Sequence, residues 1–305
     1  MDVWLNSKTN LSVGIKESFM SLLAKLKDDK STFSLEFFPP KKDMPVSSVY
    51  AAIEALKEYG PAFVSVTYGA GGSGQSRTLE IAKHIKNDIE LEAIAHLTCV
   101  GADEKSIDDV LYKLKEAGIT NVLALRGDVP EGMSRQQAFG SYKHATDLIT
   151  HIKRDDNFSV AAAAYPEIHV ESENLKDDVK YMKMKADAGA DFFITQLCFD
   201  TNAIIRFFEQ LGKTRCYVPV LTGIMPILNP KQIIRMSLLS ACSIPAPLSK
   251  LISRYGENAD DFKKAGLEYA IGQIDTLIDE GINKFHLYTM NKSKEISQII
   301  KNSQL

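Results

Sequence analysis

Eight short runs of apolar, strand-forming residues alternate with segments of helical periodicity along nearly the whole chain. A helical segment follows every run, and no linker, charge block or low-complexity stretch interrupts the series. This alternation predicts an α/β fold, a single (β/α)8 TIM barrel, with an open doubly wound sheet as the structural alternative. The predicted strands are residues 33–40, 62–68, 91–99, 121–127, 158–165, 192–198, 218–225 and 284–290.

The predicted helices lie between these runs, and one more helix precedes the first run. Residues 14–29 carry apolar side chains at helical spacing, so we expect residues 1–30 to form an N-terminal helical extension. The whole chain, residues 1–305, is then expected to form one domain. The other helices are expected at residues 46–59, 75–87, 104–117, 142–153, 174–188, 202–211, 230–242, 247–254, 258–280 and 293–301.

The composition excludes several classes of function. A net charge of -3 and a pI near 6.1 provide no basic surface, so neither nucleic acid nor a membrane is expected as a partner. No signal peptide opens the chain, and no apolar run approaches the ~18 residues of a membrane span. The four cysteines lack metal-ligand spacing, which is typical of reduced thiols in a cytoplasmic protein without a structural metal.

The segment FSLEFFPP, residues 33–40, places Glu36 at the centre of an apolar strand. Two prolines close the segment, and proline cannot continue a hydrogen-bonded ladder. A buried, unpaired carboxylate is costly, so it either finds partners or takes up a proton, and Glu36 is a candidate proton donor at neutral pH. The alternative is a glutamate at the end of a strand that faces water.

Nearly every predicted strand is apolar in its interior and ends near a hydrogen-bonding or ionisable side chain. In a (β/α)8 barrel these ends meet at one mouth, where active sites lie, so the pattern predicts a functional site there. In chain order these residues are Glu36, Thr67, His96, Thr98, Arg126, Gly127, Asp128, Tyr165, Glu167, His169, Gln196, Thr222, Tyr288 and Thr289.

Spacing along the first and last strands suggests a contact between them. Ser34 and Glu36 are two residues apart and share a strand face, as do His286 and Tyr288. Since a closed barrel sets its last strand beside its first, we hypothesise that Ser34, Glu36 and His286 form a hydrogen-bonded group that controls the protonation of Glu36. The alternative is that His286 is a satisfied core histidine.

The glycine-rich segment at residues 69–74 has the form GxGxxG between a predicted strand and a helix. A dinucleotide fingerprint of this form requires an acidic residue at the tip of the next strand, and none is present, so a flexible rim loop is favoured. The tripeptide Arg126-Gly127-Asp128 suits a flat anionic ligand better, because arginine binds pyrophosphate and glycine permits close backbone approach. The alternative is an ion pair at the rim.

Seven segments taken together closely resemble the flavin-dependent methylenetetrahydrofolate reductase family. They are FSLEFFPP, FVSVTYGAGG, AHLTC, LALRGD, AAYPEIH, DAGADFFITQ and FHLYTMN, in order across residues 32 to 292. The resemblance implies a short, bacterial-type member consisting of the catalytic barrel, with bound FAD. It also implies reduction of 5,10-methylenetetrahydrofolate to 5-methyltetrahydrofolate by ping-pong hydride transfer from NADH or NADPH, for methionine synthesis.

The resemblance also implies roles for individual residues. Glu36 would be the general acid that opens the folate's five-membered ring, and Ser34 and His286 would support it. Asp128 would favour the cationic iminium beside the flavin. The folate would contact Glu36, Gln196, Met236, Tyr288 and Lys292. The FAD contacts would be Thr67, His96, Arg126, Gly127, Asp128, Ala145, Tyr165, His169, Asp178 and Lys185.

Three positions depart from the family pattern, and other functions stay open. Met184 stands where many members have arginine, Met236 where an aromatic residue is frequent, and Lys292 where arginine is common. One alternative is that the flavin barrel takes electrons from a ferredoxin or iron–sulfur partner subunit. Another is a non-catalytic subunit that binds flavin or folate. The family further suggests a homo-oligomer, either a dimer or a tetramer.

Overall fold

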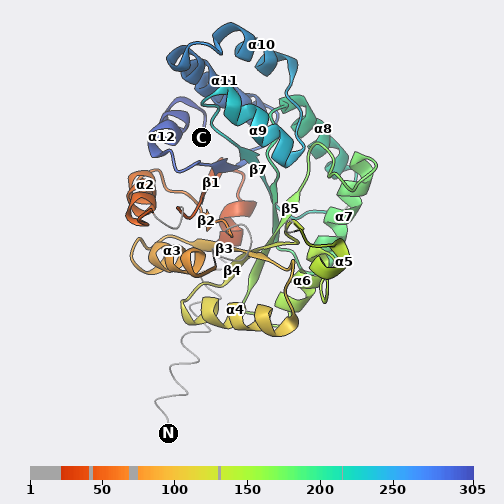
Figure 1. Cartoon of the computed structure of the whole chain (residues 1–305). Helices are drawn as coiled ribbons and strands as arrows, with labels where there is room; N and C mark the ends of the chain where they lie inside the picture. The colour runs from red at the N-terminus through yellow and green to blue at the C-terminus, as the bar shows by residue number, and fades with distance from the viewer. Residues whose placement is uncertain (1–21, 41–43, 69–74, 130–131, 215) are drawn as a thin grey trace.

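The computed structural model of the chain describes residues 22–40, 44–68, 75–129, 132–214 and 216–305 (Figure 1). Eight parallel strands pair in chain order, and the last pairs with the first, so the sheet is a closed barrel. The predicted (β/α)8 barrel is therefore confirmed, and the open-sheet alternative is wrong. The strands are β1 (Thr32–Phe37), β2 (Val64–Val66), β3 (Ala93–Thr98), β4 (Asn121–Leu125), β5 (Ser159–Ala164), β6 (Phe192–Thr195), β7 (Val220–Ile224) and β8 (Lys284–Tyr288).

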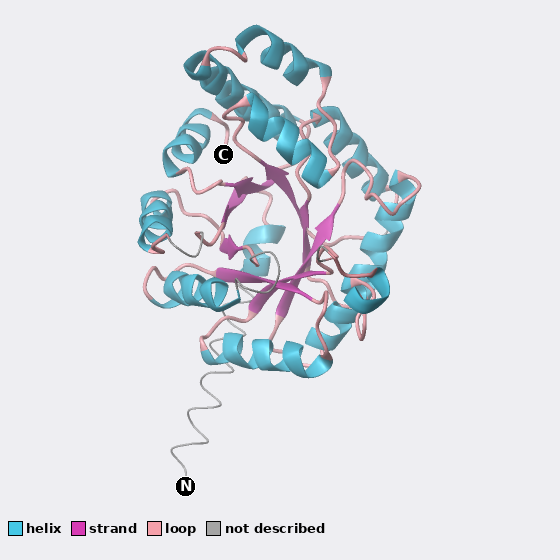
Figure 2. Cartoon of the chain, viewed as in Figure 1, coloured by secondary structure: helices cyan, strands magenta, loops and turns pink. Residues whose placement is uncertain are grey.

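Helices surround the barrel, as Figure 2 shows. Ten of the eleven named helices were predicted to within a few residues at each end, and β2 is shorter than predicted. The unpredicted helix is α5, a single turn capped by Ser134 and Gln137. The helices are α2 (Ser47–Lys57), α3 (Gln75–Asn87), α4 (Glu104–Glu116), α5 (Arg135–Ala138), α6 (Ala145–Ile152), α7 (Leu175–Asp187), α8 (Thr201–Gly212), α9 (Pro230–Ser240), α10 (Ala246–Tyr255), α11 (Ala259–Asp279) and α12 (Ser293–Asn302).

Alternation along the strands separates the outer core from the barrel interior. On β1, Leu35 and Phe37 pack into the main core with the helices, whereas Ser34 and Glu36 point into the barrel. The register pairs Ser34 with His286 of β8, and their side chains share the interior. The pairing of β1 with β8 closes the barrel and forms its seam. On these two strands a two-residue period places polar side chains inside the barrel and apolar side chains outside it.

The amino-terminal end of the barrel is closed by apolar side chains. Residues 22–27 form a helical turn, drawn in red in Figure 1, and Leu22 and Leu26 pack with Phe63 and Phe192 of the barrel interior. The ammonium of Lys284 donates to the carbonyl oxygen of Asp28 at 2.5 Å and holds this segment in place. The predicted N-terminal helix is thus present over residues 22–27, and its earlier residues lie outside the described residues. The glycine-rich segment at residues 69–74 also lies outside the described residues.

Candidate active site

Glu36 lies at the carboxyl end of β1 inside the barrel mouth, with 5% of its surface exposed. His286 of β8 is fully buried, and its Nε2 lies 3.2 Å from Oε2 of Glu36. The hydroxyl of Ser34 lies 2.7 Å from the other ring nitrogen, Nδ1. The structure therefore brings together the three residues that the strand spacing predicted to meet.

The hydroxyl of Ser34 has two possible acceptors for one proton. It lies 3.2 Å from the carbonyl oxygen of Phe285 and 2.7 Å from Nδ1 of His286. If the hydroxyl donates to Phe285, then Nδ1 of His286 must donate to the hydroxyl; if it donates to Nδ1, then Nε2 carries the proton that faces Glu36. In the first arrangement Nε2 can donate to the Glu36 carboxylate only if the imidazole is cationic, whereas in the second a neutral imidazole donates from Nε2.

His96 of β3 approaches the same carboxylate from the opposite side of β1. Its Nε2 lies 3.4 Å from Oε2 of Glu36, which is within ion-pair distance. The atom is buried and has no aligned hydrogen-bond partner among the described residues. A buried polar nitrogen is costly without a partner, so the nearby Glu36 carboxylate is the group that compensates His96 here.

These contacts decide the protonation of Glu36. Burial raises its pKa, but the hydrogen bond from His286 and the nearby imidazole of His96 together outweigh burial and lower the pKa from 4.5 to about 2. The carboxylate is therefore ionised in the protein without ligand. Of the two outcomes expected for a buried carboxylate, partners or an added proton, the structure shows partners, because imidazoles from two other strands lie against Glu36.

Tyr288 and Gly223 form a second fixed element of the mouth. The phenol of Tyr288 crosses β7 and donates to the carbonyl oxygen of Thr195 on β6 at 2.7 Å. A side chain at Gly223 would prevent this crossing, since a Cβ there would lie 2.6 Å from Cε2 of Tyr288. The Tyr288 hydroxyl is thus bonded to Thr195, the residue that precedes Gln196. The side chain of Gln196 is also engaged, because its Oε1 accepts from the Leu197 amide at 2.8 Å.

Arg126, at the end of β4, is held by an acidic residue that the sequence analysis did not single out. Its guanidinium makes two bonds to Glu171, at 2.6 and 3.0 Å, and lies over the ring of Phe139. Arg135 of α5 binds the same carboxylate at 2.5 Å. These bonds lower the pKa of Glu171 to about 2 and outweigh burial, which acts to raise it. The rim ion pair that was an alternative for Arg126 is therefore present.

Residues after β5 and on α7 form a compact polar group beside Arg126. Lys185 donates to the carbonyl oxygen of Ala163 at 2.8 Å, and its ammonium lies 5.5 Å from the ring of Tyr165. Burial lowers the pKa of Lys185 to about 8, although Asp178 opposes the shift. Asp178 accepts from the amide of His169 at 2.9 Å, so it ties this loop to the start of α7.

The remaining predicted residues follow the strands or lie on the helices after them. Asp128 is exposed after β4, and its charge acts on Arg126 and Tyr165. Gly127 has a φ of +85°, which favours glycine. The others are placed as follows: Thr67 follows β2 and is half-buried, Ala145 begins α6, Met184 is exposed on α7, Met236 packs on the apolar cluster under α9, and Lys292 is exposed before α12.

Ser65 and Glu171 belong to the site region and were missed. Ser65 lies on β2 with its hydroxyl 3.5 Å from Nε2 of His286, and its two-residue spacing from Thr67 would have placed it in the interior. Glu171 follows His169 by two residues, but nothing in the local sequence shows that its partner is Arg126, 45 positions earlier.

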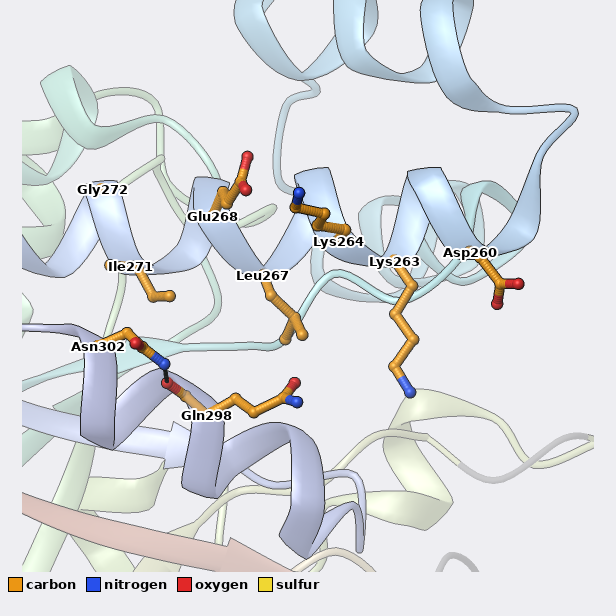
Figure 3. A pocket seen from close by; sticks show the side chains of 9 residues that line it. All are labelled: Asp260, Lys263, Lys264, Leu267, Glu268, Ile271, Gly272, Gln298 and Asn302. Carbon is orange, nitrogen blue, oxygen red and sulfur yellow. Dashed lines mark hydrogen bonds between the residues drawn. The ribbon is translucent and has the colours of Figure 1, made fainter.

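A groove on the outer surface, between α11 and α12, is a separate feature and has a volume of about 700 Å³. Figure 3 shows its lining, in which Leu267 and Ile271 lie among charged and polar side chains. None of the predicted site residues lines it, and one rim residue, Lys263, already pairs with Glu295 at 2.5 Å. Among the described residues, no cluster of His, Cys, Asp and Glu could hold a metal ion, and no helix could cross a membrane.

The fold and the buried carboxylate between two imidazoles define a (β/α)8-barrel protein with an acid–base site at its mouth. The sequence then identifies the family. The family model described as Methylenetetrahydrofolate reductase matches residues 21–304, so the chain belongs to the methylenetetrahydrofolate reductase family.

Similar proteins include both long and short members. The chain is 38% identical over 285 residues to "Methylenetetrahydrofolate reductase (NADH) 1" of Arabidopsis thaliana, covering 90% of this chain and 48% of that protein. It thus spans about half the length of the plant relatives it matches. It is 34% identical to "5,10-methylenetetrahydrofolate reductase" of Escherichia coli (strain K12), covering 86% of each.

A solved structure shares the fold at low sequence identity. It is a Clostridium thermocellum protein described as binding two copies of 5-methyl-5,6,7,8-tetrahydrofolic acid. Its TM-score is 0.61 at 14% identity, and the match covers 91% of this chain and 95% of that one. At this identity the likeness shows the fold alone.

Proposed function

We propose that this protein reduces 5,10-methylenetetrahydrofolate to 5-methyltetrahydrofolate, with FAD as bound cofactor and NADH or NADPH as electron donor. The single observation that carries the proposal is the contact of Glu36 with His286 and His96 at the mouth of a barrel of this family. Folate reduction needs an acid held in a dry site, and this cluster supplies one. The short Escherichia coli relative named for the same reaction supports the assignment.

The polar group after β4 and β5 fits a flavin dinucleotide by the chemistry of its donors. Arg126 offers five N–H donors, of which the bonds to Glu171 use two, and Lys185 adds an ammonium inside the mouth. The partly buried His169 has its pKa lowered by burial and is therefore neutral at pH 7. This combination of cations, a neutral imidazole and the ring of Tyr165 suits a diphosphate joined to flat rings.

FAD, when bound, would supply reversible hydride transfer. Arg126, His169 and Lys185 would hold its phosphates and ribitol, and Gly127 would allow close approach of the backbone. We assign the other expected contacts to Thr67, His96, Ala145 and Tyr165. Asp178 would act by holding the His169 loop, since both of its carboxylate oxygens are already bonded to that loop.

Glu36 would deliver a proton to the folate amine that leaves the bridging carbon, which opens the five-membered ring to a cationic iminium. Because the carboxylate is ionised without ligand, the proton must be held by the group as a whole, with His286 or His96 as the store. Ser34 would orient His286 through Nδ1. The open carboxylate of Asp128 would stabilise the cation.

The folate would lie between β1 and β6. Gln196 would hydrogen-bond the pterin after its amide turns from the Leu197 N–H. Tyr288 would contribute its ring, because its hydroxyl is bonded to Thr195. Met236 and Lys292 would contact the outer parts of the substrate, where a flexible thioether replaces the aromatic residue frequent in the family.

Anaerobic half-reactions test the proposal. The purified protein is expected to bind FAD, to be bleached by NADH or NADPH, and to recover its colour when methylenetetrahydrofolate is added. Protein that does not take up FAD would contradict the proposal. Bleaching only by a reduced ferredoxin would instead favour an electron-donating partner subunit, and flavin binding without either half-reaction would favour a non-catalytic subunit. Light scattering would test the expected dimer or tetramer, and cell fractionation the cytoplasmic location.

A further inference from the structure

The backbone at the end of β1 is held by a side chain instead of a strand. Phe38 follows β1, and the next two residues, Pro39 and Pro40, have no N–H to offer a neighbouring strand. Asn291, after β8, pairs with both polar groups of Phe38: its Oδ1 accepts from the Phe38 amide at 3.0 Å, and its Nδ2 donates to the Phe38 carbonyl at 2.9 Å. The amide thus imitates one more rung of the β1–β8 ladder.

Thr289 binds the backbone carbonyl of Glu36. Its amide donates to the carbonyl oxygen of Glu36 at 3.1 Å, and its hydroxyl donates to the same oxygen at 2.6 Å. The amide of Asn291 in turn donates to the Thr289 hydroxyl at 3.1 Å. Bonds from Thr289 and Asn291 therefore hold the backbone on both sides of Phe37.

The turn that makes these bonds is strained. Met290 and Asn291 have φ angles of +51° and +55°, in the left-handed region that costs residues other than glycine ~1 kcal/mol or more each. Asparagine tolerates this region better than most residues. A strained turn persists only where other interactions determine it, and here these include the bonds from Thr289 and Asn291 to Glu36 and Phe38.

We propose that Asn291 is a positioning residue for Glu36: by clamping Phe38, it fixes the end of β1 and so the direction in which the carboxylate points toward substrate. The inference deepens the proposed function and rests on Glu36 as the acid. A small displacement of a catalytic group is enough to slow proton transfer severely, so the clamp should affect the folate half-reaction and leave flavin reduction alone.

Asn291→Gly separates the side chain from the turn, since glycine adopts a φ of +55° without strain but cannot bind Phe38. Asn291→Asp is the second variant, because it keeps an acceptor for the Phe38 amide and loses the donor to the Phe38 carbonyl. Asn302→Asp is the matched control: Asn302 lies at the exposed end of α12, and its amide bonds only Gln298 among the described contacts, at 2.7 Å. Amide exchange at Phe38 reports whether the clamp has opened.

We expect Asn291→Gly to lose about tenfold in the folate half-reaction with unchanged flavin reduction, and Asn302→Asp to match the wild type. A wild-type folate rate in Asn291→Gly would overturn the inference; if that variant does not fold, Asn291→Asp decides by the same criterion. If the wild-type protein itself does not reduce the folate, the proposed function fails. In that case NMR titration of His286 and His96 tests the role of Asn291 independently. Unchanged titration midpoints in Asn291→Gly would overturn the inference that Asn291 positions Glu36, and shifted midpoints would support it.

Discussion

The Nε2 atom of His286 lies 3.2 Å from Oε2 of Glu36, although 250 positions separate the two residues in the sequence. The contact exists because β8 pairs with β1 and sets Ser34 opposite His286, one side-chain period before Glu36. The protonation of the acid is therefore a property of the barrel seam.

Glu36→Gln should abolish proton delivery and leave electron entry intact. We expect the folate half-reaction to fall by about 100-fold or more, because positioned acids contribute that much. Flavin reduction by NADH or NADPH should change by less than about twofold, since Glu36 is not assigned to that step. Stopped-flow absorbance under nitrogen measures both rates. A variant with an unaffected folate half-reaction would refute Glu36 as the acid.

Ser34→Ala should loosen the position of His286. The variant removes the hydroxyl 2.7 Å from Nδ1, so the ring loses the hydrogen bond that orients Nε2 toward Glu36. We expect the folate half-reaction to slow by about tenfold, which matches the loss of one buried hydrogen bond. Ser65→Ala is the control, because Ser65 makes a longer contact of 3.5 Å. Equal effects of the two variants would contradict the assignment.

Lys185→Met should stabilise the protein when no FAD is bound. The pKa of Lys185 falls from 10.5 to about 8 because burial penalises the charge. Between those values the unfolded chain binds more protons than the native one, so stability contributed by this site rises with pH from about 8 to 10.5. The variant should gain about 1–3 kcal/mol at pH 7, and the gain should shrink above pH 8.

Urea unfolding at pH 7 and pH 10 measures this difference. Lys183→Met is the control on the same helix, since Lys183 is exposed and pairs with Asp187 at 2.8 Å. That variant should change the free energy of unfolding by less than about 0.5 kcal/mol. A wild-type protein as stable at pH 7 as Lys185→Met would show that the ammonium is well solvated.

Gly223→Ala should destabilise the barrel mouth. Its Cβ would lie 2.6 Å from Tyr288 and 2.7 Å from the carbonyl oxygen of Thr195, so the Tyr288 to Thr195 hydrogen bond would have to open. We expect a loss of about 1–3 kcal/mol in the free energy of unfolding. Gly272→Ala is the control, in an open position on α11, and should gain about 0.5–1 kcal/mol. Thermal unfolding of both proteins measures the contrast, and equal midpoints would contradict it.

Much of the fold and part of the site could be predicted from local sequence. The period of apolar residues marks each strand and helix, because it reports which side of an element is buried. The two-residue spacing on β1 and β8 predicted that Ser34 and Glu36 share a face and that barrel closure could bring His286 within their reach. The single turn of α5 could not be found in this way, because it buries only Ala138.

The sequence by itself determined the barrel, the residues at its mouth and the contact across its seam, since each depends on periodicity and chain order. Only the tertiary structure decided the charge of Glu36 and the partner of Arg126. The free energy of a buried charge depends on the groups that surround it in space, and here His96, His286 and Glu171 come from separate βα units. For that reason the local sequence around Glu36 left open whether the acid is protonated or paired, whereas the folded chain holds it paired and ionised.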